Sequence, residues 1–400
     1  MALALMETAP PPTVAAVPKL SRTDAFLAKF RRITSSGQFF GEIDGLRFIA
    51  IVSVVLFHIH SYLNQANHFS YAHANESFRN FAGLLRHGDI GVELFFVISG
   101  FILALPFASC FLRGGKPVRL KSYYLRRVTR LEPPYFLALA LCFVLLWHHH
   151  PSEGREYARS LSASLLYSHN FFWPRGTLPL TNPVAWSLEI EIQFYVLAPF
   201  IACVYQLGKT PRRALLAALI LARVVILANY PLPHLSVLDF YDLFLIGFLL
   251  ADLWVCNELN VGTHEWFYIP AAGAMFAAVW FLGVRWLSLE IGLFYYFCLK
   301  SRFLRSLLAN RWIATVGGMC YSIYLIHWML ITTVGSRVVH QFTGSYAVDF
   351  IIHSLLLALL VLAAGAIYFK LIERPCMAKD WYKKLFRFSR PVPQPASAAL

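Results

Sequence analysis

The chain has 400 residues, of which 58% are hydrophobic and only 14% are charged, and its mean hydropathy is +0.57. An ordinary soluble domain is about 45–50% apolar and about 25% charged, and a single soluble core stops growing near about 250–300 residues. This composition excludes a water-soluble enzyme, a disordered chain and a disulfide scaffold for most of the sequence. It favours a protein whose solvent is lipid.

The formal net charge is +14. In a soluble protein such an excess would suggest nucleic acid as a partner. Here the basic residues fall in short segments between apolar runs, which is the pattern that orients a membrane protein. We therefore expect the lipid bilayer, and no nucleic acid, as a partner.

Ten apolar runs predict an all-α, polytopic integral membrane protein of about ten transmembrane helices, since a span needs about 20 mostly apolar residues. The runs cover residues 48–64, 90–110, 131–147, 186–206, 214–230, 237–256, 267–284, 286–300, 315–336 and 349–371. The pair around Arg285 fits two short helices or one longer broken element.

The distribution of basic residues predicts the orientation. With the N-terminus in the cytoplasm, 27 of the 35 Lys and Arg residues face that side, which supports two cytoplasmic termini. We expect a disordered tail over residues 1–42, a transmembrane domain over 43–376 and a basic cytoplasmic tail over 377–400. The aromatic stretch 157–173 predicts a helix lying at the outer interface.

The first run contains a histidine that could carry chemistry. Arg47 and His58 are eleven positions apart, which places them within about 20° on one helical stripe, with about 16 Å of rise between them. An ionisable group inside a span normally faces the bundle interior, and imidazole moves protons near neutral pH. His58 is therefore a candidate general base; a histidine that only packs between helices is the alternative.

Three arginines precede the third run. Arg127 and Arg130 share a helical face, and Arg126 lies beside them. Guanidinium groups grip phosphate oxygens well, so these residues predict a cytoplasmic site for a phosphate-rich donor. A basic anchor that only orients the chain is the alternative.

Carboxylates within apolar runs predict a polar cavity. Glu189 and Glu191 are two positions apart and point about 160° from each other, so they can hardly face the same partner. Glu93, at the start of the second run, fits an external cap or an internal polar partner.

The ninth run places Tyr324 and His327 on one face, where they could line this cavity or belong to an interfacial aromatic belt. His148, His149 and His150 are consecutive and do not converge as helix ligands would, so no metal site is expected.

Together these motifs resemble the membrane-bound acyltransferase 3 family, which includes polysaccharide and Nod-factor O-acetyltransferases. The blocks that carry the resemblance are IDGLRFIAIVSVVLFH (43–58), GVELFFVISGFIL (91–103), YLRRVTRLEPPY (124–135), WSLEIEIQFYVLAP (186–199), YSIYLIHW (321–328) and IERP (372–375). Their order and spacing cover nearly the whole chain.

The resemblance implies a bundle of about ten helices that moves an acyl group, commonly acetyl, from cytoplasmic coenzyme A to a sugar hydroxyl. It matches the family histidine and its arginine to His58 and Arg47, and the family R-x-x-R to Arg127 and Arg130. The family acid falls on Glu191, while Ile192 stands where many members have a second Glu and Glu189 precedes.

The resulting hypothesis is an O-acyltransferase of a bacterial cytoplasmic (inner) membrane, with acetyl-CoA as donor substrate, no tightly bound cofactor and a carbohydrate acceptor. His58 would take the hydroxyl proton or accept the acyl group first, Glu191 would orient the imidazole, and Arg47 would line the path. A secondary transporter or a flippase of a sugar-linked substrate is the alternative. The sequence leaves the acceptor and the oligomeric state open.

Overall fold

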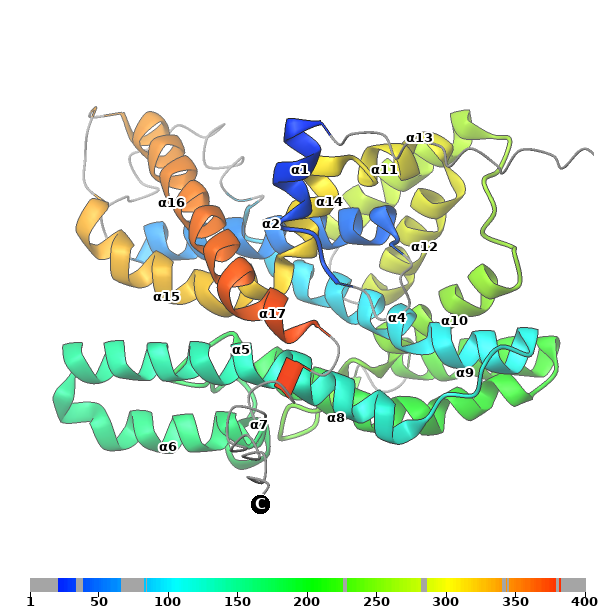
Figure 1. Ribbon diagram of the computed structural model, residues 1–400, viewed down its shortest axis with the longest axis horizontal. Coiled ribbons are helices and arrows are strands. Elements are labelled where there is room, and N and C mark those ends of the chain that lie inside the picture. The colour runs from blue at the N-terminus through cyan, green and yellow to red at the C-terminus, as the bar shows by residue number, and fades with distance from the viewer. Residues whose placement is uncertain are drawn as a thin grey trace, which may run out of the picture.

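The computed structural model describes residues 21–33, 39–65, 83, 85–225, 229–281, 286–339, 343, 345–378 and 381–382. Within these residues the chain is helical and contains no strand (Figure 1). The helices are α1 (Arg22–Ala28), α2 (Gly41–Gln65), α4 (Gly91–Arg113), α5 (Leu120–His149), α6 (Gly154–Leu165), α7 (His169–Phe172), α8 (Ala185–Ile201), α9 (Lys209–Val225), α10 (Tyr241–Val255), α11 (Glu265–Phe281), α12 (Leu287–Lys300), α13 (Arg302–Leu308), α14 (Arg311–Gly318), α15 (Cys320–Val338), α16 (Tyr346–Tyr368) and α17 (Arg374–Cys376).

Short turns extend several of these helices. The 3₁₀ turns are η2 (Gly88–Ile90), η3 (Pro151–Glu153), η4 (Ala202–Gln206) and η6 (Val237–Asp239), and a π-helical turn, η7 (Phe369–Glu373), joins α16 to α17. Within the described residues, each of the ten apolar runs overlaps a helix, and the stretch 157–173 contains most of α6 and all of α7. The predicted tail over residues 1–42 contains α1, while residues 1–20 lie outside the described part.

The prediction of ten membrane spans is confirmed only in part. In the described residues, five helical stretches are long and apolar enough to cross a membrane, at Gly41–Asn64, Gly88–Arg113, Leu120–His149, Ala185–Gln206 and Ala347–Cys376. A sixth is formed if α14 and α15, which meet at an angle of 66°, are one broken span. Helices α9 to α12 have 17, 15, 17 and 14 residues, short of the length that a straight span needs. The orientation of the termini stays a prediction.

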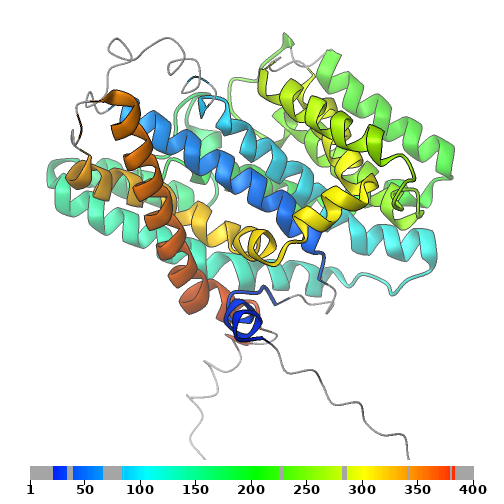
Figure 2. The same cartoon turned by 90° about the horizontal axis from the view of Figure 1, so that it is seen from above.

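Helix α2 lies at the centre of the bundle. It contacts α4, α13, α14, α15 and α16, and Figure 2 shows it running beside α4 through the middle of the molecule. Glycines allow the closest approaches. A Cβ on Gly100 of α4 would clash with the Phe244 carbonyl oxygen of α10, and a Cβ on Gly317 of α14 would clash with the Asp44 carbonyl oxygen of α2. These helices therefore meet backbone to backbone.

Helix α5 continues through two adjacent prolines, so the arginines expected before the third span belong to the span's own helix. Pro133 lacks the N–H that would bond the Thr129 carbonyl, and the indole N–H of Trp381 donates to that carbonyl at 3.0 Å instead. A hydroxyl from α15 also reaches this region, since Tyr321 donates to the Leu131 carbonyl at 2.9 Å. These side chains supply hydrogen-bond donors to backbone carbonyls of α5 beside the two prolines.

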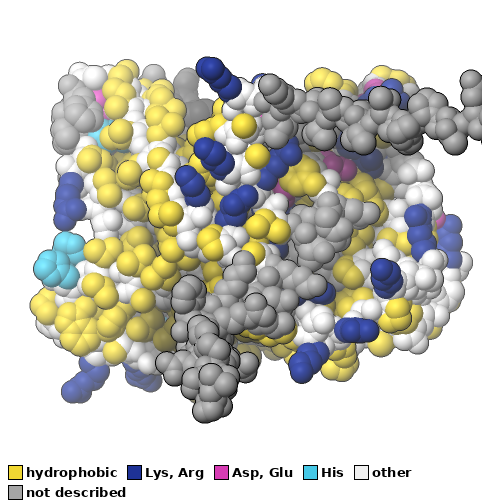
Figure 3. All heavy atoms as spheres, viewed as in Figure 1, with side chains coloured by type: hydrophobic (Ala, Val, Ile, Leu, Met, Phe, Trp, Pro, Cys, Tyr) yellow, Lys and Arg dark blue, Asp and Glu magenta, His cyan; other side chains and the backbone are white. Residues whose placement is uncertain are grey.

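The outer surface is apolar, as expected of a chain in lipid. On α16, Leu355 is 61% exposed and Leu359 is 64% exposed. Hydrophobic side chains cover the left half of the face shown in Figure 3, over α15, α16 and α5. Together with the long apolar helices, this surface indicates an integral membrane protein.

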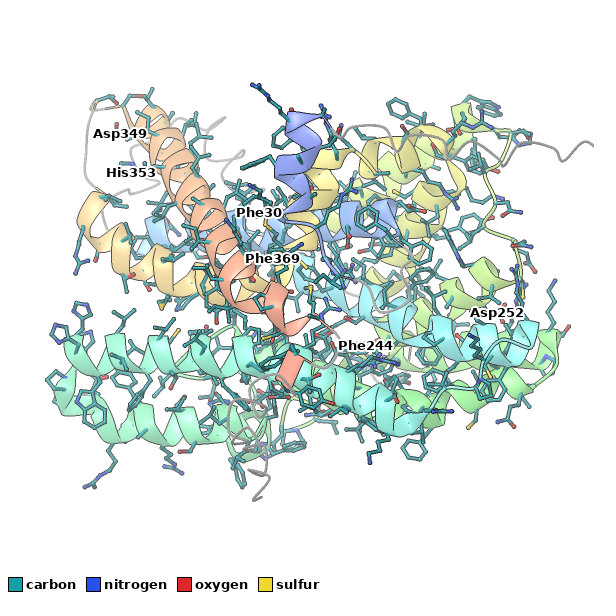
Figure 4. The ribbon with its side chains drawn as sticks, in the orientation of Figure 1. Phe30, Phe244, Asp252, Asp349, His353 and Phe369 are labelled. Carbon is teal, nitrogen blue, oxygen red and sulfur yellow. The ribbon has the colours of Figure 1, made fainter. Side chains whose placement is uncertain are left out.

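A charged cluster fixes α9 against α10 at the end of the molecule where Figure 4 labels Asp252. Asp252 is fully buried and pairs with Arg212 and, at 2.6 Å, with Arg213. Beyond the end of α10, hydrogen bonds from Arg213 and Lys209 lower the pKa of the Glu258 carboxyl to about 2. The two carboxylates compensate two of the three basic charges, so the cluster acts as a structural contact between α9 and α10.

Candidate active site

A cavity of about 1200 Å³ is lined mainly by α2, α4, α5, α8 and α15. The charged residues that line it are Arg32, Asp44, Arg47, Arg113, Arg126, Arg127, Arg130, Glu191, Arg305 and Glu373. Seven arginines thus face three carboxylates, so the cavity is strongly positive when those carboxylates are ionised. Such a lining is suited to an anion with several phosphate groups.

Asp44 anchors two of these arginines. Its Oδ1 accepts hydrogen bonds from Nη1 of Arg32 at 2.9 Å and from Nη1 of Arg47 at 2.5 Å. Asp44 is only 3% exposed. One carboxylate therefore holds two guanidinium groups at the cavity wall and leaves the trio with one net positive charge.

Arg127 and Arg130 both line the cavity, as their shared face on α5 predicts, and Arg126 lies exposed beside them. The Arg127 guanidinium lies 3.6 Å from the centroid of the Tyr123 ring and donates to the Tyr123 carbonyl at 3.0 Å. The Nε of Arg130 is buried and has no hydrogen-bond partner among the described residues. An unpartnered buried guanidinium nitrogen is costly, so a ligand oxygen would be well placed to bind it.

The structure separates the two carboxylates of α8, as their spacing predicts. Glu191 lines the cavity, where its Oε1 accepts hydrogen bonds from Ser99 and Tyr195, both at 2.5 Å. Glu189 is fully buried and accepts the backbone N–H groups of His169 at 3.2 Å and Asn170 at 2.8 Å. Glu189 therefore holds α7 against α8, whereas Glu191 belongs to the cavity wall.

His58 forms a pair with His327 of α15. Nδ1 of His58 lies 2.9 Å from the Val54 carbonyl oxygen and 3.2 Å from Nε2 of His327. Nδ1 of His327 lies 2.7 Å from the Tyr324 carbonyl oxygen. Because a carbonyl can only accept, both rings carry their proton on Nδ1, an assignment made from these partners. The lone pair of the His58 ring is therefore on Nε2.

The imidazole pair lies next to the cavity, behind Tyr324. Tyr324 lines the cavity, and its ring centroid is 5.5 Å from that of His327, which in turn is 4.8 Å from that of His58. The Tyr324 hydroxyl lies 2.7 Å from Ser187 Oγ, which fixes the ring in place. His58 itself is not among the residues that line the cavity, and the structure shows Glu191 bonded to Ser99 and Tyr195 rather than to the imidazole.

Glu93 lies in the first turn of α4, and its Oε2 is buried without a hydrogen-bond partner among the described residues. It is not among the residues that line the cavity. The structure therefore favours an internal position for Glu93 over an external cap.

Sequence reasoning missed five charged residues of the cavity, namely Arg32, Asp44, Arg113, Arg305 and Glu373. Arg32 and Arg305 counted only as charges that orient the chain, although both line the cavity. Glu373 is 1% exposed and accepts from the backbone N–H of Ser322 at 3.1 Å and from its hydroxyl at 2.5 Å. The sequence feature that could have indicated Glu373 is its position as a single acidic residue just after the apolar run 349–371.

The fold and the cavity define a helical membrane protein with an arginine-lined hollow beside a histidine pair, and sequence comparison assigns the chain to a family. A family model described as an acyltransferase domain (Acyl_transf_3) matches residues 40–370. The chain therefore belongs to this acyltransferase family, which confirms the resemblance found in its motifs.

The chain is similar to several bacterial proteins. It is 24% identical over 398 residues to O-acetyltransferase OatA of Staphylococcus aureus, covering 90% of this chain and 60% of that protein. It is 27% identical over 368 residues to the putative membrane-bound transacylase BcsY of Komagataeibacter xylinus, covering 83% and 82%. Peptidoglycan O-acetyltransferase OatA of Listeria monocytogenes matches over 178 residues at 26% identity, covering 42% and 25%.

The chain thus spans about 60% of the length of the Staphylococcus relative that it matches. No solved structure matches it.

Proposed function

We propose that this protein is a membrane O-acetyltransferase that moves an acetyl group from acetyl-CoA to a hydroxyl of a carbohydrate. The observation that carries the proposal is the arginine-lined cavity backed by a histidine pair, in a chain of an acyltransferase family. The names of the relatives from Staphylococcus and Listeria support O-acetyl transfer as the reaction.

The donor would bind with its phosphates in the cavity. Coenzyme A carries several phosphate groups, and the cavity offers seven arginines, one of which has a buried Nε free to donate. Arg126, Arg127 and Arg130 would hold these phosphates at the cavity edge, while Arg47, fixed by Asp44, would line the way inward. The basic residues of the sequence favour the cytoplasm, where acyl-CoA is made, as the side of entry.

The transfer itself would use the lone pair on Nε2 of His58. As the sugar oxygen attacks the thioester carbonyl carbon, His58 takes the hydroxyl proton. The carbon–sulfur bond then breaks, and the leaving thiolate receives that proton, so that an acetyl ester and free coenzyme A result. Nε2 of His327 lies 3.2 Å from Nδ1 of His58, and it would share the Nδ1–H with the Val54 carbonyl and stabilise the transient imidazolium. Alternatively, the same lone pair could accept the acetyl group first and pass it on.

Glu191 would have a different task from the orientation of the imidazole. Glu191 accepts the hydroxyl of Tyr195, whose ring centroid lies 5.5 Å from the guanidinium carbon of Arg127. We therefore assign Glu191 to positioning the cavity wall near Arg127. The acyl chain would pass this wall and Tyr324 to reach His58.

The test is to incubate the purified full-length chain with radiolabelled acetyl-CoA and membranes that contain surface glycans. A transferase releases coenzyme A thiol and labels glycan, whereas a transporter or flippase does neither. Replacing His58 with Ala should reduce the transfer rate by about 100- to 10,000-fold. His148→Ala is the matched control, because His148 is exposed near the end of α5 and lines no described cavity. Equal rates in both variants would remove His58 from the chemistry.

A further inference from the structure

A second pocket, of about 330 Å³, lies at the opposite end of α5 and α15 from the arginine cavity. Its lining comes from residues 142–150 of α5 and its end, from residues 180–181, and from residues 328–336 of α15. Pockets that bind small molecules measure about 300–1,000 Å³, so this one can hold a small ligand or one ring of a larger one.

The histidine pair lies between the two hollows. On α15, Tyr324 lines the arginine cavity and Trp328 lines the second pocket, and the two are about 6 Å apart along the helix axis, with His327 between them. The ring centroid of His58 is 5.2 Å from that of Trp328. An aromatic side chain thus separates the imidazole pair from each hollow.

The second pocket contains three hydroxyl groups of α15 whose protons are donated to backbone carbonyls of the same helix. Thr332 donates to the Trp328 carbonyl at 3.0 Å, and Thr333 donates to the Met329 carbonyl at 2.7 Å. Ser336 donates to the Thr333 carbonyl at 2.9 Å. Each oxygen keeps a lone pair for a ligand, so the pocket is equipped to accept hydrogen bonds from ligand hydroxyls.

No Asp, Glu, Lys or Arg is among the described residues that line this pocket. Its titratable groups are two imidazoles, His149 and His150, and the buried thiol of Cys142. The pocket therefore suits a neutral ligand rich in hydroxyl groups, with an apolar face that can lie on the indole of Trp328. A sugar ring has this chemistry, whereas coenzyme A, with its phosphates, does not.

We infer that the second pocket is the acceptor subsite and that it binds a sugar ring of the carbohydrate; the inference rests on the proposed acetyl transfer. Leu131, which lines the arginine cavity, and Cys142, which lines the second pocket, are about 16 Å apart along α5. Donor and acceptor therefore enter from opposite ends of one helix and meet at His58. The indole of Trp328 has to turn aside for a sugar hydroxyl to reach Nε2.

The test removes the three hydroxyls of α15 together, in a variant with Thr332→Val, Thr333→Val and Ser336→Ala. In cells that produce the full chain, acetyl esters on surface glycans should fall at least about tenfold, because three hydrogen bonds to the acceptor are lost. Binding of radiolabelled coenzyme A by the purified variant should stay within about twofold of the unmodified chain, which a misfolded variant would not do.

Thr315→Val is the matched control. Its hydroxyl donates to the Arg311 carbonyl at 2.6 Å in the same helical geometry, but on α14 and outside the pocket. Normal glycan acetylation by the triple variant would overturn the acceptor subsite while leaving the acetyl transfer intact. Failure of the unmodified chain to acetylate any glycan would instead overturn the proposed function, and the inference with it.

A second measurement does not depend on removing hydrogen bonds. Ser336→Cys places a thiol at an exposed position of the pocket. A membrane-impermeant, negatively charged thiol reagent added outside the cells should abolish the glycan acetylation that this variant retains before labelling, and it should spare the unmodified chain, whose Cys142 is buried. Full acetylation after complete labelling of the introduced thiol would contradict the inference.

Discussion

Replacing Arg130 with Gln should weaken donor binding without weakening the fold. The Nε of Arg130 is buried and has no hydrogen-bond partner among the described residues. The substitution therefore breaks no described hydrogen bond of Nε. The charge of Arg130 is also costly to bury, and the free energy of unfolding should therefore stay the same or rise slightly. A hydrogen bond to a charged group contributes about 1.5–3 kcal/mol, so losing one to a phosphate should raise the KM for acetyl-CoA roughly 10- to 150-fold.

The assay compares two quantities for the purified variant: the KM for acetyl-CoA in the transfer reaction, and the thermal unfolding midpoint in the same detergent. Arg119→Gln serves as the control, because Arg119 is exposed just before α5 and does not line the cavity. Arg47→Gln gives the contrast. It should raise the KM and also cost about 1–3 kcal/mol of stability, since it breaks the pair with Asp44. An unchanged KM in Arg130→Gln at normal folding would refute the assignment of the donor phosphates to this cavity.

Four further substitutions test the packing and the carboxylates. Asp252→Asn leaves two guanidinium groups without their buried counter-charge and should cost about 3–5 kcal/mol in thermal unfolding; a loss smaller than about 1 kcal/mol would show that this contact between α9 and α10 is dispensable. Gly317→Ala would press a methyl group on the Asp44 carbonyl, so about 1–3 kcal/mol of stability should be lost, and an unchanged unfolding midpoint would count against the backbone contact. Glu189→Gln keeps one amide oxygen as an acceptor but turns its N–H₂ toward the other backbone N–H, so it should cost about 1–3 kcal/mol while the remaining folded protein transfers acetyl normally. Glu191→Gln should have the opposite profile, with normal stability and slowed transfer; the reverse pattern for the two variants would invalidate the separation of their roles.

The sequence predicted the helices well because apolar composition fixes where a chain can be helical in lipid. It predicted the length of the ninth span less well. The run 315–336 reads as one helix, but the structure bends it by 66° between α14 and α15. Gly317 and Gly318 weaken the helix there, and Gly317 fits against α2. That contact joins residues far apart in the sequence, which periodicity cannot reveal.

The sequence was enough to identify several residues of the candidate site, but it was not enough to predict which of them contact each other in the folded chain. His58, Arg127 and Arg130 were identifiable because charged or titratable groups in an apolar helix are expensive. The pairing of His58 with His327 spans 269 positions, and only the packing of α2 against α15 creates it. Arg32 could not be recognised, since a basic residue before a span is ordinary until its salt bridge with Asp44 is seen.

The most direct test of the account is a structure of the full chain with a non-hydrolysable thioether analogue of acetyl-CoA. The account predicts that the analogue's phosphates contact Arg127 and Arg130 and that its acyl carbonyl carbon lies within about 4 Å of the position that a hydroxyl would occupy beside Nε2 of His58. An analogue bound outside the arginine cavity, or one whose acyl group stops on the cavity side of Tyr324, would contradict it.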